Sequence, residues 1–243
     1  MNTCLQTFLT FLVSASLFAT RVTADEKADT NAPLAIHMIS GSGEYKSEAS
    51  LKEFSQHLQE HYNVNVTASW GKDGVKELEN LEALKDAELL LVFARRMKLG
   101  AEQMEIIRDH WRKGKPIVGI RTASHAFSRE DNKVFDLEVL GNNYQGHHGG
   151  EKVKVANVPQ QKEHPILNGV APFTSTKLYK CGELPDSTTV LQKGDIGKAN
   201  YPVTLVNEYQ GGRVFYTSLG VPEDFQDANF RRLLTNAIFW TTH

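Results

Sequence analysis

AELLLVFARRMKLGAEQMEIIRDHWRKGKPIVGIRTASH, residues 87–125, contains the pattern that decides the fold. Ala87–Phe93 is a nearly continuous apolar run, which is typical of a strand buried on both faces. Ala101–Lys113 has apolar residues at helical spacing and is followed by Gly114, which predicts a helix with a C-terminal glycine. Pro116–Ile120 is apolar again and predicts a second strand. Two strands joined by a helix of this length indicate a parallel pair with a right-handed crossover.

The same alternation extends upstream. Leu34–Ile39 and Val64–Ala68 each predict a strand. Between them, Ser50 and Glu53 have the spacing of a capping box, which predicts the start of a helix. Val75–Leu84 predicts a further short helix. The apolar face of the first of these helices consists of Leu51, Phe54 and Leu58.

Downstream of about residue 150 the predicted strands are shorter and are separated by Pro and Gly. Gln210–Gly212 predicts the turn of a hairpin. Asn229–Trp240 predicts a last helix that packs on the sheet. The shorter strands are Lys152–Val158, Thr188–Leu191, Pro202–Val206 and Arg213–Thr217. We therefore expect one domain over residues 34–243, an α/β fold with three layers and a doubly wound, mostly parallel sheet.

The N-terminal segment differs in composition from the rest of the chain. Leu5–Ala19 is mostly apolar and is followed by the small-residue site Val22-Thr23-Ala24. This pattern predicts a signal peptide over residues 1–24 with cleavage after Ala24. The alternative, an uncleaved anchor, needs a longer apolar run than this one. We expect residues 25–33 to be a disordered leader, and the mature protein to be secreted or periplasmic and not membrane-bound.

The net charge bears on which partners the protein binds, and the cysteine content bears on what stabilises its fold. Removal of residues 1–24 leaves 26 basic and 29 acidic residues, a formal charge of −3. Such a balance gives no indication of nucleic-acid binding. Cys181 is then the single remaining cysteine, so no intramolecular disulfide can form and the fold depends on its apolar core.

Two predicted strand ends are followed by basic residues. In an open parallel sheet, ligands bind beyond the carboxyl ends of the strands. Arg95 and Arg96 follow one strand, and Arg121 follows the next, with Thr122, Ser124 and His125 after it. We expect Arg121 at the rim of the crevice, where its guanidinium can orient an oxygen-rich group. His125 is a candidate general acid or base, and the other residues are candidate substrate contacts; solvated loop charges and a satisfied core histidine are the alternatives.

Asn142–Gly150 is dense in hydrogen-bonding side chains and flanked by glycines, which predicts a loop. The composition fits sugar binding, with His147 as a further catalytic candidate; a surface loop without a ligand is the alternative. Candidate substrate contacts are Asn143, Tyr144, His148 and, in a separate turn, His164. His147 and His148 with His125 or His164 could bind zinc, although no fixed ligand spacing is present. His164 is equally interpretable as a structural turn residue.

Four segments together carry a resemblance to a known family: Gly119–Phe127, His164–Val170, Gly212–Gly220 and Phe230–Trp240. Through them the chain resembles the ThuA-like (trehalose utilisation) family over nearly its whole mature length. The resemblance implies a class I glutamine amidotransferase-like, flavodoxin-like topology and a role with sugars or their oxidised derivatives.

Two departures from the family pattern bear on activity. Arg121 stands where the amidotransferase elbow has its nucleophilic cysteine, and Val221 stands where the family tail has a histidine. Arginine cannot attack a carbonyl, so glutamine hydrolysis is not expected.

The sequence supports three readings of function. The first is an exported protein that acts on a carbohydrate or keto-sugar through Arg121, His125 and His147. The second is a carbohydrate-binding or accessory module without catalysis, which the absent nucleophile and Val221 favour. The third is a zinc-dependent hydrolase, which needs three converging protein ligands.

Overall fold

The sheet is the framework on which the other elements are placed. In the computed structural model, which describes Met1 and residues 32–243, nine of the strands form one sheet in the order β2-β1-β3-β4-β11-β10-β9-β6-β7. The neighbours from β2 to β11 are parallel, and those from β11 to β7 are antiparallel. The parallel part is formed by β1 (Leu34–Gly41), β2 (Val64–Trp70), β3 (Leu89–Ala94), β4 (Ile117–Ile120) and β11 (Gly212–Thr217). The expected parallel core is therefore present, with an antiparallel extension.

The antiparallel part contains the later strands of the chain. They are β6 (Lys152–Asn157), β7 (Phe173–Thr176), β9 (Thr189–Asp195) and β10 (Asn200–Tyr209). Strands β10 and β11 are joined by Gln210 and Gly211, both with positive φ, so the predicted hairpin turn is confirmed. The predicted signal peptide and the leader up to residue 31 lie outside the described residues.

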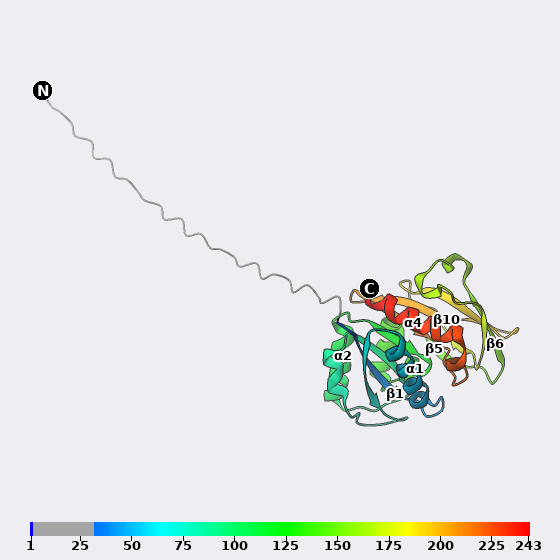
Figure 1. Cartoon of the computed structure of the whole chain (residues 1–243), viewed down its shortest axis with the longest axis horizontal. Coiled ribbons are helices and arrows are strands. Elements are labelled where there is room, and N and C mark those ends of the chain that lie inside the picture. The colour runs from blue at the N-terminus through cyan, green and yellow to red at the C-terminus, as the bar shows by residue number, and fades with distance from the viewer. Residues whose placement is uncertain (2–31) are drawn as a thin grey trace. The chain divides into compact units, whose positions relative to one another are not determined.

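Helices cover both faces of the sheet, as the three-layer prediction requires (Figure 1). One face carries α1 (Ser47–His61) and α4 (Ala228–Thr242), and the predicted apolar face of α1 is buried there. The opposite face carries the 3-10 helix η1 (Leu81–Asp86), α2 (Ala101–Arg112) and the π-helical turn η3 (Phe135–Val139). Two apolar clusters, one on each face, make up the core. Within the described residues no helix is long and apolar enough to cross a membrane.

The predicted capping box of α1 is wrong. The helix begins at Ser47, its N-cap is Lys46 in the left-handed conformation, and no side chain caps it. Ser50 lies inside the first turn, where its backbone N–H donates to the Lys46 carbonyl. The start is set by the loop after β1, because the Ser47 hydroxyl contacts both the Ser42 N–H and the Ser40 hydroxyl at 2.8 Å.

The predicted helix over Val75–Leu84 is also wrong, because residues 75–80 are irregular and only the short η1 follows. The reason is a tertiary contact. The Gln103 side chain of α2 accepts from the Leu78 N–H at 2.9 Å and donates to the Leu78 carbonyl at 2.7 Å. These bonds replace those that a helix would have made within the segment.

The polar segment that was expected to be a loop contains a strand. Tyr144–His147 forms β5, which pairs antiparallel with β8 (Tyr179–Cys181) in a separate two-stranded sheet. The pairing aligns His147 with Tyr179, so two segments distant in the sequence form one structure. No pattern of alternating hydrophobicity marks either strand.

Gly114, just past the end of α2, offers a test of this packing. It has φ +63°, and a Cβ at this position would overlap the Gln210 carbonyl oxygen of the β10–β11 turn. Gly114→Ala should therefore lower the free energy of unfolding by about 2–5 kcal/mol, from a backbone cost and an overpacking cost together.

Gly197→Ala is the matched control for Gly114→Ala, because Gly197 has φ +84° with no atom near the added Cβ. It should show the backbone cost alone, about 1–2 kcal/mol. Urea unfolding of both variants measures the difference. Equal losses would mean that the close approach to the hairpin turn contributes nothing.

Candidate functional site

The carboxyl ends of β1, β3, β4 and β11 meet at one edge of the sheet, because these strands are parallel neighbours. The strand order reverses direction between β1 and β3, which is the topological switch point where ligands bind in doubly wound folds. The loops that leave this edge contain Tyr45 after β1, Arg95 and Arg96 after β3, Arg121 after β4, and Ser218 after β11.

Arg121 occupies a strained turn. It follows β4 directly and has φ +52°, a conformation that few residues other than glycine adopt at low cost. Its carbonyl accepts a hydrogen bond from the buried Tyr216 hydroxyl at 2.9 Å, which holds the turn in place. The residues after it form the 3-10 helix η2 (Arg121–His125).

The Arg121 side chain points inward and is 0% exposed. Its guanidinium donates to the carbonyls of Ser218 and Lys177 and contacts the Tyr45 hydroxyl at 3.3 Å. It also lies against two aromatic faces, 4.6 Å from the ring centroid of Tyr45 and 4.1 Å from that of Tyr179. No carboxylate forms an ion pair with it among the described residues. Carbonyl dipoles and ring quadrupoles therefore compensate for the lost hydration of the cation.

The expected position of Arg121 at the crevice rim is corrected by this geometry. The two terminal nitrogens of this buried guanidinium donate to backbone carbonyls and the Tyr45 hydroxyl, and its Nε is buried without a partner, so the side chain does not present its fork to a ligand. Its observed contacts join three loops, those that contain Tyr45, Lys177 and Ser218. In this structure Arg121 holds the loops of the site together.

Tyr179 is the centre of an aromatic cluster that sequence reasoning missed. The cluster comprises Tyr179, Tyr144, His125 and His147. The rings of His125 and Tyr144 stack at 4.6 Å and 21°, and the ring of Tyr179 lies 4.8 Å from that of Tyr144. Tyr179 thus brings together three residues that the sequence had suggested: His125, Tyr144 and His147. It lies in the three-residue strand β8, which no sequence motif marks.

Asp136 positions Tyr144 in this cluster. Its carboxylate accepts from the Tyr144 N–H at 2.9 Å and from the Asn142 side chain at 2.7 Å. Burial raises the pKa of Asp136 to about 6, although both hydrogen bonds oppose the shift. Asp136 lies in the π-helical turn η3, and its bond to the Tyr144 N–H holds the first residue of β5 in place.

His125 is electrically neutral at ordinary pH. Burial, and then the positive charges of Arg96 and Arg95, lower its pKa to about 3. Its Nδ1 lies 3.0 Å from the Ser124 hydroxyl. A neutral imidazole has one donor and one acceptor nitrogen, and a pKa this low makes the ring a weak base in the absence of a bound anion. Burial also raises the pKa of Tyr144, which keeps the phenol protonated as a hydrogen-bond donor.

A groove of about 670 Å³ opens beside His125. Every charged residue that lines it is basic: Arg96, Lys98, Arg129 and Lys133. Asn132 and Ser128 add neutral polar groups, and Met97 and Phe127 add apolar surface. We call this feature the basic groove. Its electrostatics favour a negatively charged ligand with hydroxyl groups.

The remaining predicted residues are placed as follows. Arg95 lies 3.2 Å from Asp73 and 3.7 Å from Glu44, so its charge is already paired. Thr122 is fully buried with its hydroxyl unpartnered, and Asn143 donates to the Glu183 carbonyl at 2.8 Å.

The two other histidines that the sequence suggested do not join the cluster. His148 packs on Tyr201 with its Nε2 buried and unpartnered. His164 is a structural turn residue at the opposite edge: its Nδ1 accepts from the Ile166 N–H, and its ring packs on Trp240, which also contacts Arg213 at the start of β11. The structure therefore separates His164 from the other candidates.

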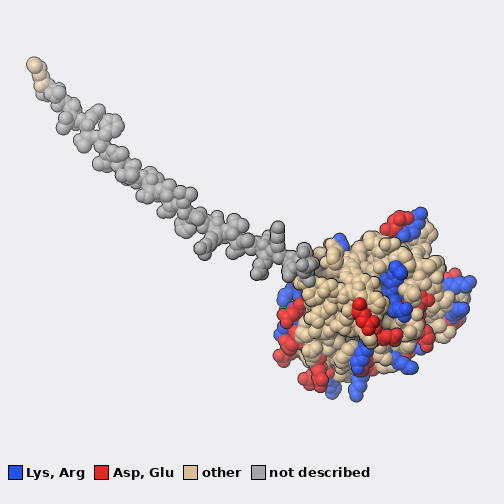
Figure 2. All heavy atoms as spheres, in the orientation of Figure 1, with Lys and Arg blue, Asp and Glu red and all other residues tan. Residues whose placement is uncertain are grey.

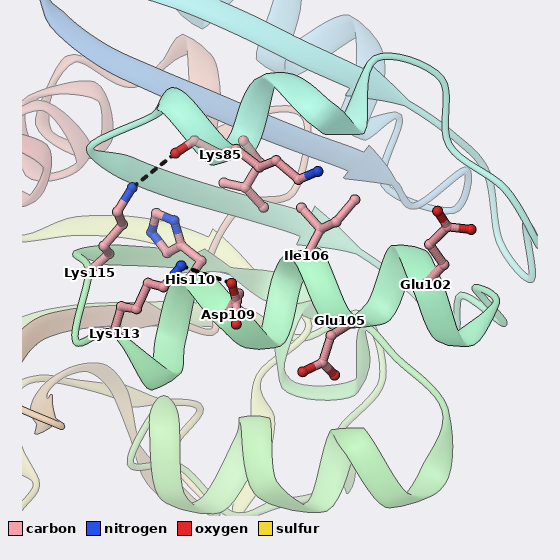
Figure 3. Close-up of a pocket in the computed structure, with 9 residues that line it drawn as sticks. Lys85, Glu102, Glu105, Ile106, Asp109, His110, Lys113 and Lys115 are labelled. Carbon is pink, nitrogen blue, oxygen red and sulfur yellow. Dashed lines mark hydrogen bonds and ion pairs between the residues drawn. The ribbon is translucent and has the colours of Figure 1, made fainter.

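A different hollow of about 470 Å³ lies between η1 and α2 (Figure 3). Lys115, just before β4, lies at one end of it and donates to the Lys85 and Ala87 carbonyls. The hollow is therefore near the amino ends of the strands, away from the switch point. Figure 3 also shows acidic and basic side chains along α2, where Asp109 pairs with Lys113.

Metal binding has no support from the geometry. Among residues 32–243, no group of three His, Cys, Asp or Glu side chains is arranged to hold a metal ion.

The surface charge of the chain is mixed. On the face drawn in Figure 2, basic and acidic side chains are interspersed. The basic groove is thus a local concentration of charge on a chain with a nearly balanced total.

Comparison with known proteins gives a family and a fold. The family model ThuA, described as trehalose utilisation, matches residues 35–241. Putative ThuA-like proteins from Bacteroides uniformis and Parabacteroides merdae are each 16% identical with a TM-score of 0.66, and the alignments cover 86% of this chain and 92% and 90% of theirs. A cytoplasmic protein from Salmonella typhimurium is 13% identical with a TM-score of 0.60, over 86% of this chain and 100% of that one. A search of curated proteins found no match. The expected α/β fold is confirmed.

Arg121→Lys tests the role of the buried guanidinium. Lysine keeps the charge but cannot reach both the Ser218 and the Lys177 carbonyls, so we expect the free energy of unfolding to fall by about 2–4 kcal/mol. Arg95→Lys, at the neighbouring strand end and partly exposed, is the control and should cost under about 1 kcal/mol. Thermal or urea unfolding measures both. An unchanged melting temperature for Arg121→Lys would contradict the structural role.

His125 should also make stability depend on pH. The folded-state pKa of about 3 lies below the unfolded value of 6.5, so the unfolded chain binds more protons between these values. The free energy of unfolding should fall as the pH is lowered, by at most about 2 kcal/mol for this residue between about pH 7 and pH 5. His125→Asn should remove that share of the pH dependence. Identical pH profiles for wild type and His125→Asn would exclude the proposed burial of a neutral imidazole.

Proposed function

The chain belongs to the ThuA family of trehalose utilisation proteins, and we propose that it is exported and binds and converts an acidic, oxidised sugar derivative in the basic groove. Family membership suggests a sugar-related role. The export part of the proposal rests on the apolar run and small-residue site within residues 5–24.

One observation carries the proposal: every charged side chain in the basic groove, apart from the neutral His125, is positive. Arg96, Lys98, Arg129 and Lys133 can hold a carboxylate. The Ser128 hydroxyl donates to Asp131 at 3.0 Å and can still accept from a ligand hydroxyl, whereas the Asn132 amide already bonds to the Ser124 carbonyl and the Phe127 N–H. A neutral sugar can accept hydrogen bonds from these four cations but gains no charge–charge attraction from them. An oxidised sugar supplies both the carboxylate and the hydroxyls that this lining matches.

His125 supplies the chemistry in this proposal. Its neutral imidazole lines the groove and accepts a hydrogen bond from a hydroxyl group of the bound sugar. A bound carboxylate beside Arg96 offsets one of the positive charges that lower the pKa of His125, so the ring becomes a stronger base when the ligand is present, takes a proton from the sugar and returns it to the sugar. The stacked Tyr144 keeps the ring in one orientation and retains its own phenolic proton. The reaction class is acid–base chemistry on the sugar and needs no covalent intermediate.

Glutamine hydrolysis is left out of the proposal for a chemical reason. Arg121 occupies the elbow position and is fully buried. Cys181 is the other place to look for a nucleophile, but burial raises its pKa to about 11 and its thiol lies 3.4 Å from the Asn142 side-chain oxygen. A thiol in that state is a poor nucleophile.

A binding module without catalysis is the second candidate, and Val221 favours it. Val221 is buried beside Gly220, and the N–H groups of both residues donate to the Asp224 carboxylate. This loop therefore presents no imidazole to the carboxyl edge. The two candidates agree on the ligand and differ on whether it is converted.

Calorimetric titration with glucuronate and with glucose tests the ligand class. We expect glucuronate to bind and glucose to bind at least tenfold more weakly. Arg129→Gln with Lys133→Gln should weaken glucuronate binding by about three- to tenfold, because both side chains are exposed and partly screened. Lys162→Gln, an exposed lysine outside the groove, is the control.

A second measurement separates catalysis from binding. Proton exchange or conversion of the bound sugar, followed by NMR, should occur with the wild type and cease with His125→Asn while binding persists. Binding without any conversion by the wild type would favour the binding module. Equal affinity for glucose and glucuronate would contradict the acidic-sugar proposal itself.

A further inference from the structure

A second basic pocket lies on the other side of the switch point, at the beginning of α1. It has a volume of about 460 Å³ and shares no lining residue with the basic groove. We propose that it binds a tetrahedral oxyanion, the phosphate or sulfate group of a small molecule. We call it the α1 pocket; it is lined by Ser42, Gly43, Lys46, Ser47, Glu48, Ala49, Lys52, Gly71 and Lys72.

The backbone of α1 provides the first element of this site. The helix is 15 residues long, and its first-turn N–H groups carry the positive end of the helix dipole. Its N-cap residue, Lys46, makes no side-chain capping bond. Glu48 and Ala49, in the first turn, line the pocket directly. The Ser47 N–H donates to the Ser42 carbonyl at 3.1 Å, so the Glu48 and Ala49 N–H groups are the first-turn donors left for an external acceptor.

Ser42 provides an independent observation. It is 1% exposed, it lines the α1 pocket, and its hydroxyl has no hydrogen-bond partner. The neighbouring Ser47 hydroxyl cannot serve it, because it contacts the Ser40 hydroxyl and the Ser42 N–H at 2.8 Å each. Buried hydroxyl groups without a partner are uncommon, and a ligand oxygen would satisfy this one.

The charges around the α1 pocket are mainly positive. Lys46 and Lys72 form no ion pair among the described residues, so their charges are available to a ligand. Lys52 is paired with Glu48 at 2.6 Å and also lies over the ring of Trp70. The single carboxylate is thus already neutralised by one of the three lysines.

The shape of the pocket indicates more than a bare ion. A volume of about 460 Å³ falls in the usual range of small-molecule sites. Gly43 has open space where a Cβ would lie, so the loop after β1 leaves room beside the helix start. A tetrahedral anion can occupy the helix end while the rest of the molecule fills the remaining volume.

Titration with inorganic phosphate, followed by backbone amide NMR, tests the proposal. The amide signals of Ser42, Glu48 and Ala49 should shift and saturate together. Lys46→Gln with Lys72→Gln should weaken phosphate binding by about three- to tenfold, because both side chains are exposed and partly screened, and Ser42→Ala should weaken it by several-fold. Lys162→Gln is the matched control and should leave the titration unchanged.

Sulfate and glucose 6-phosphate titrations distinguish the source of the anion. Glucose 6-phosphate should bind more tightly as the pH rises through the second pKa of its phosphate ester, about 6, whereas sulfate should show no such change. Tighter binding of glucose 6-phosphate than of inorganic phosphate would show that the remaining volume is used. Shifts confined to other residues, no saturation, or equal losses in Lys162→Gln would overturn the proposal.

These outcomes are independent of the proposed sugar-acid function. The double variant Arg129→Gln with Lys133→Gln changes the basic groove alone and should leave phosphate binding at the α1 pocket unaltered. Loss of glucuronate binding with retained phosphate binding would therefore identify two separate sites. Competition between the two ligands would show instead that a single site binds both, and would contradict the proposal.

Discussion

The buried guanidinium of Arg121 is the constraint on which the arrangement of the site depends. A cation that is fully withdrawn from water must find compensating dipoles, and here these come from loops far apart in the sequence. Ser218, Tyr45 and Lys177 lie 97, 76 and 56 residues away from it along the chain. The left-handed backbone at Arg121 directs the side chain into the protein, so the turn after β4 fastens the loops after β1, β7 and β11 to one point.

The burial of Arg121 also changes which side chains can face a ligand at this edge of the sheet. An elbow that presents a nucleophile must expose the side chain at its tip, whereas this elbow buries it. The groups that face the basic groove come from the residues just after it, above all His125, whose neutrality results from burial and from two nearby arginines. Basic pockets then flank the switch point, one beside η2 and one at the start of α1. Both are consistent with anions gathering at the carboxyl edge of a doubly wound sheet.

The fold tolerates this strained and polar edge because the rest of the sheet is strongly buried. Strand β3 is buried along its whole length, apolar clusters pack on both faces, and Cys181, the cysteine within residues 32–243, is free. Asp136 and Asp224 are polar groups held within that frame, and burial raises the pKa of each carboxyl. The Asp224 carboxylate accepts from the Gly220 and Val221 N–H groups and from the Ser175 hydroxyl.

The sequence by itself determined the features that depend on local pattern: the buried run of β3, helix α2 with Gly114 at its end, the hairpin turn at Gln210 and Gly211, and an elbow without a nucleophile. It failed where a distant contact overrode the local pattern. The Gln103 side chain bonds to the backbone of Leu78, where a helix was predicted, and the Ser47 hydroxyl bonds to the Ser42 N–H at the start of α1. The burial of Arg121 and the central place of Tyr179 were decided only by the tertiary structure. The physical reason is that periodicity and turn chemistry act over a few residues, whereas the partners of a buried charge are chosen by the order in which the strands join the sheet.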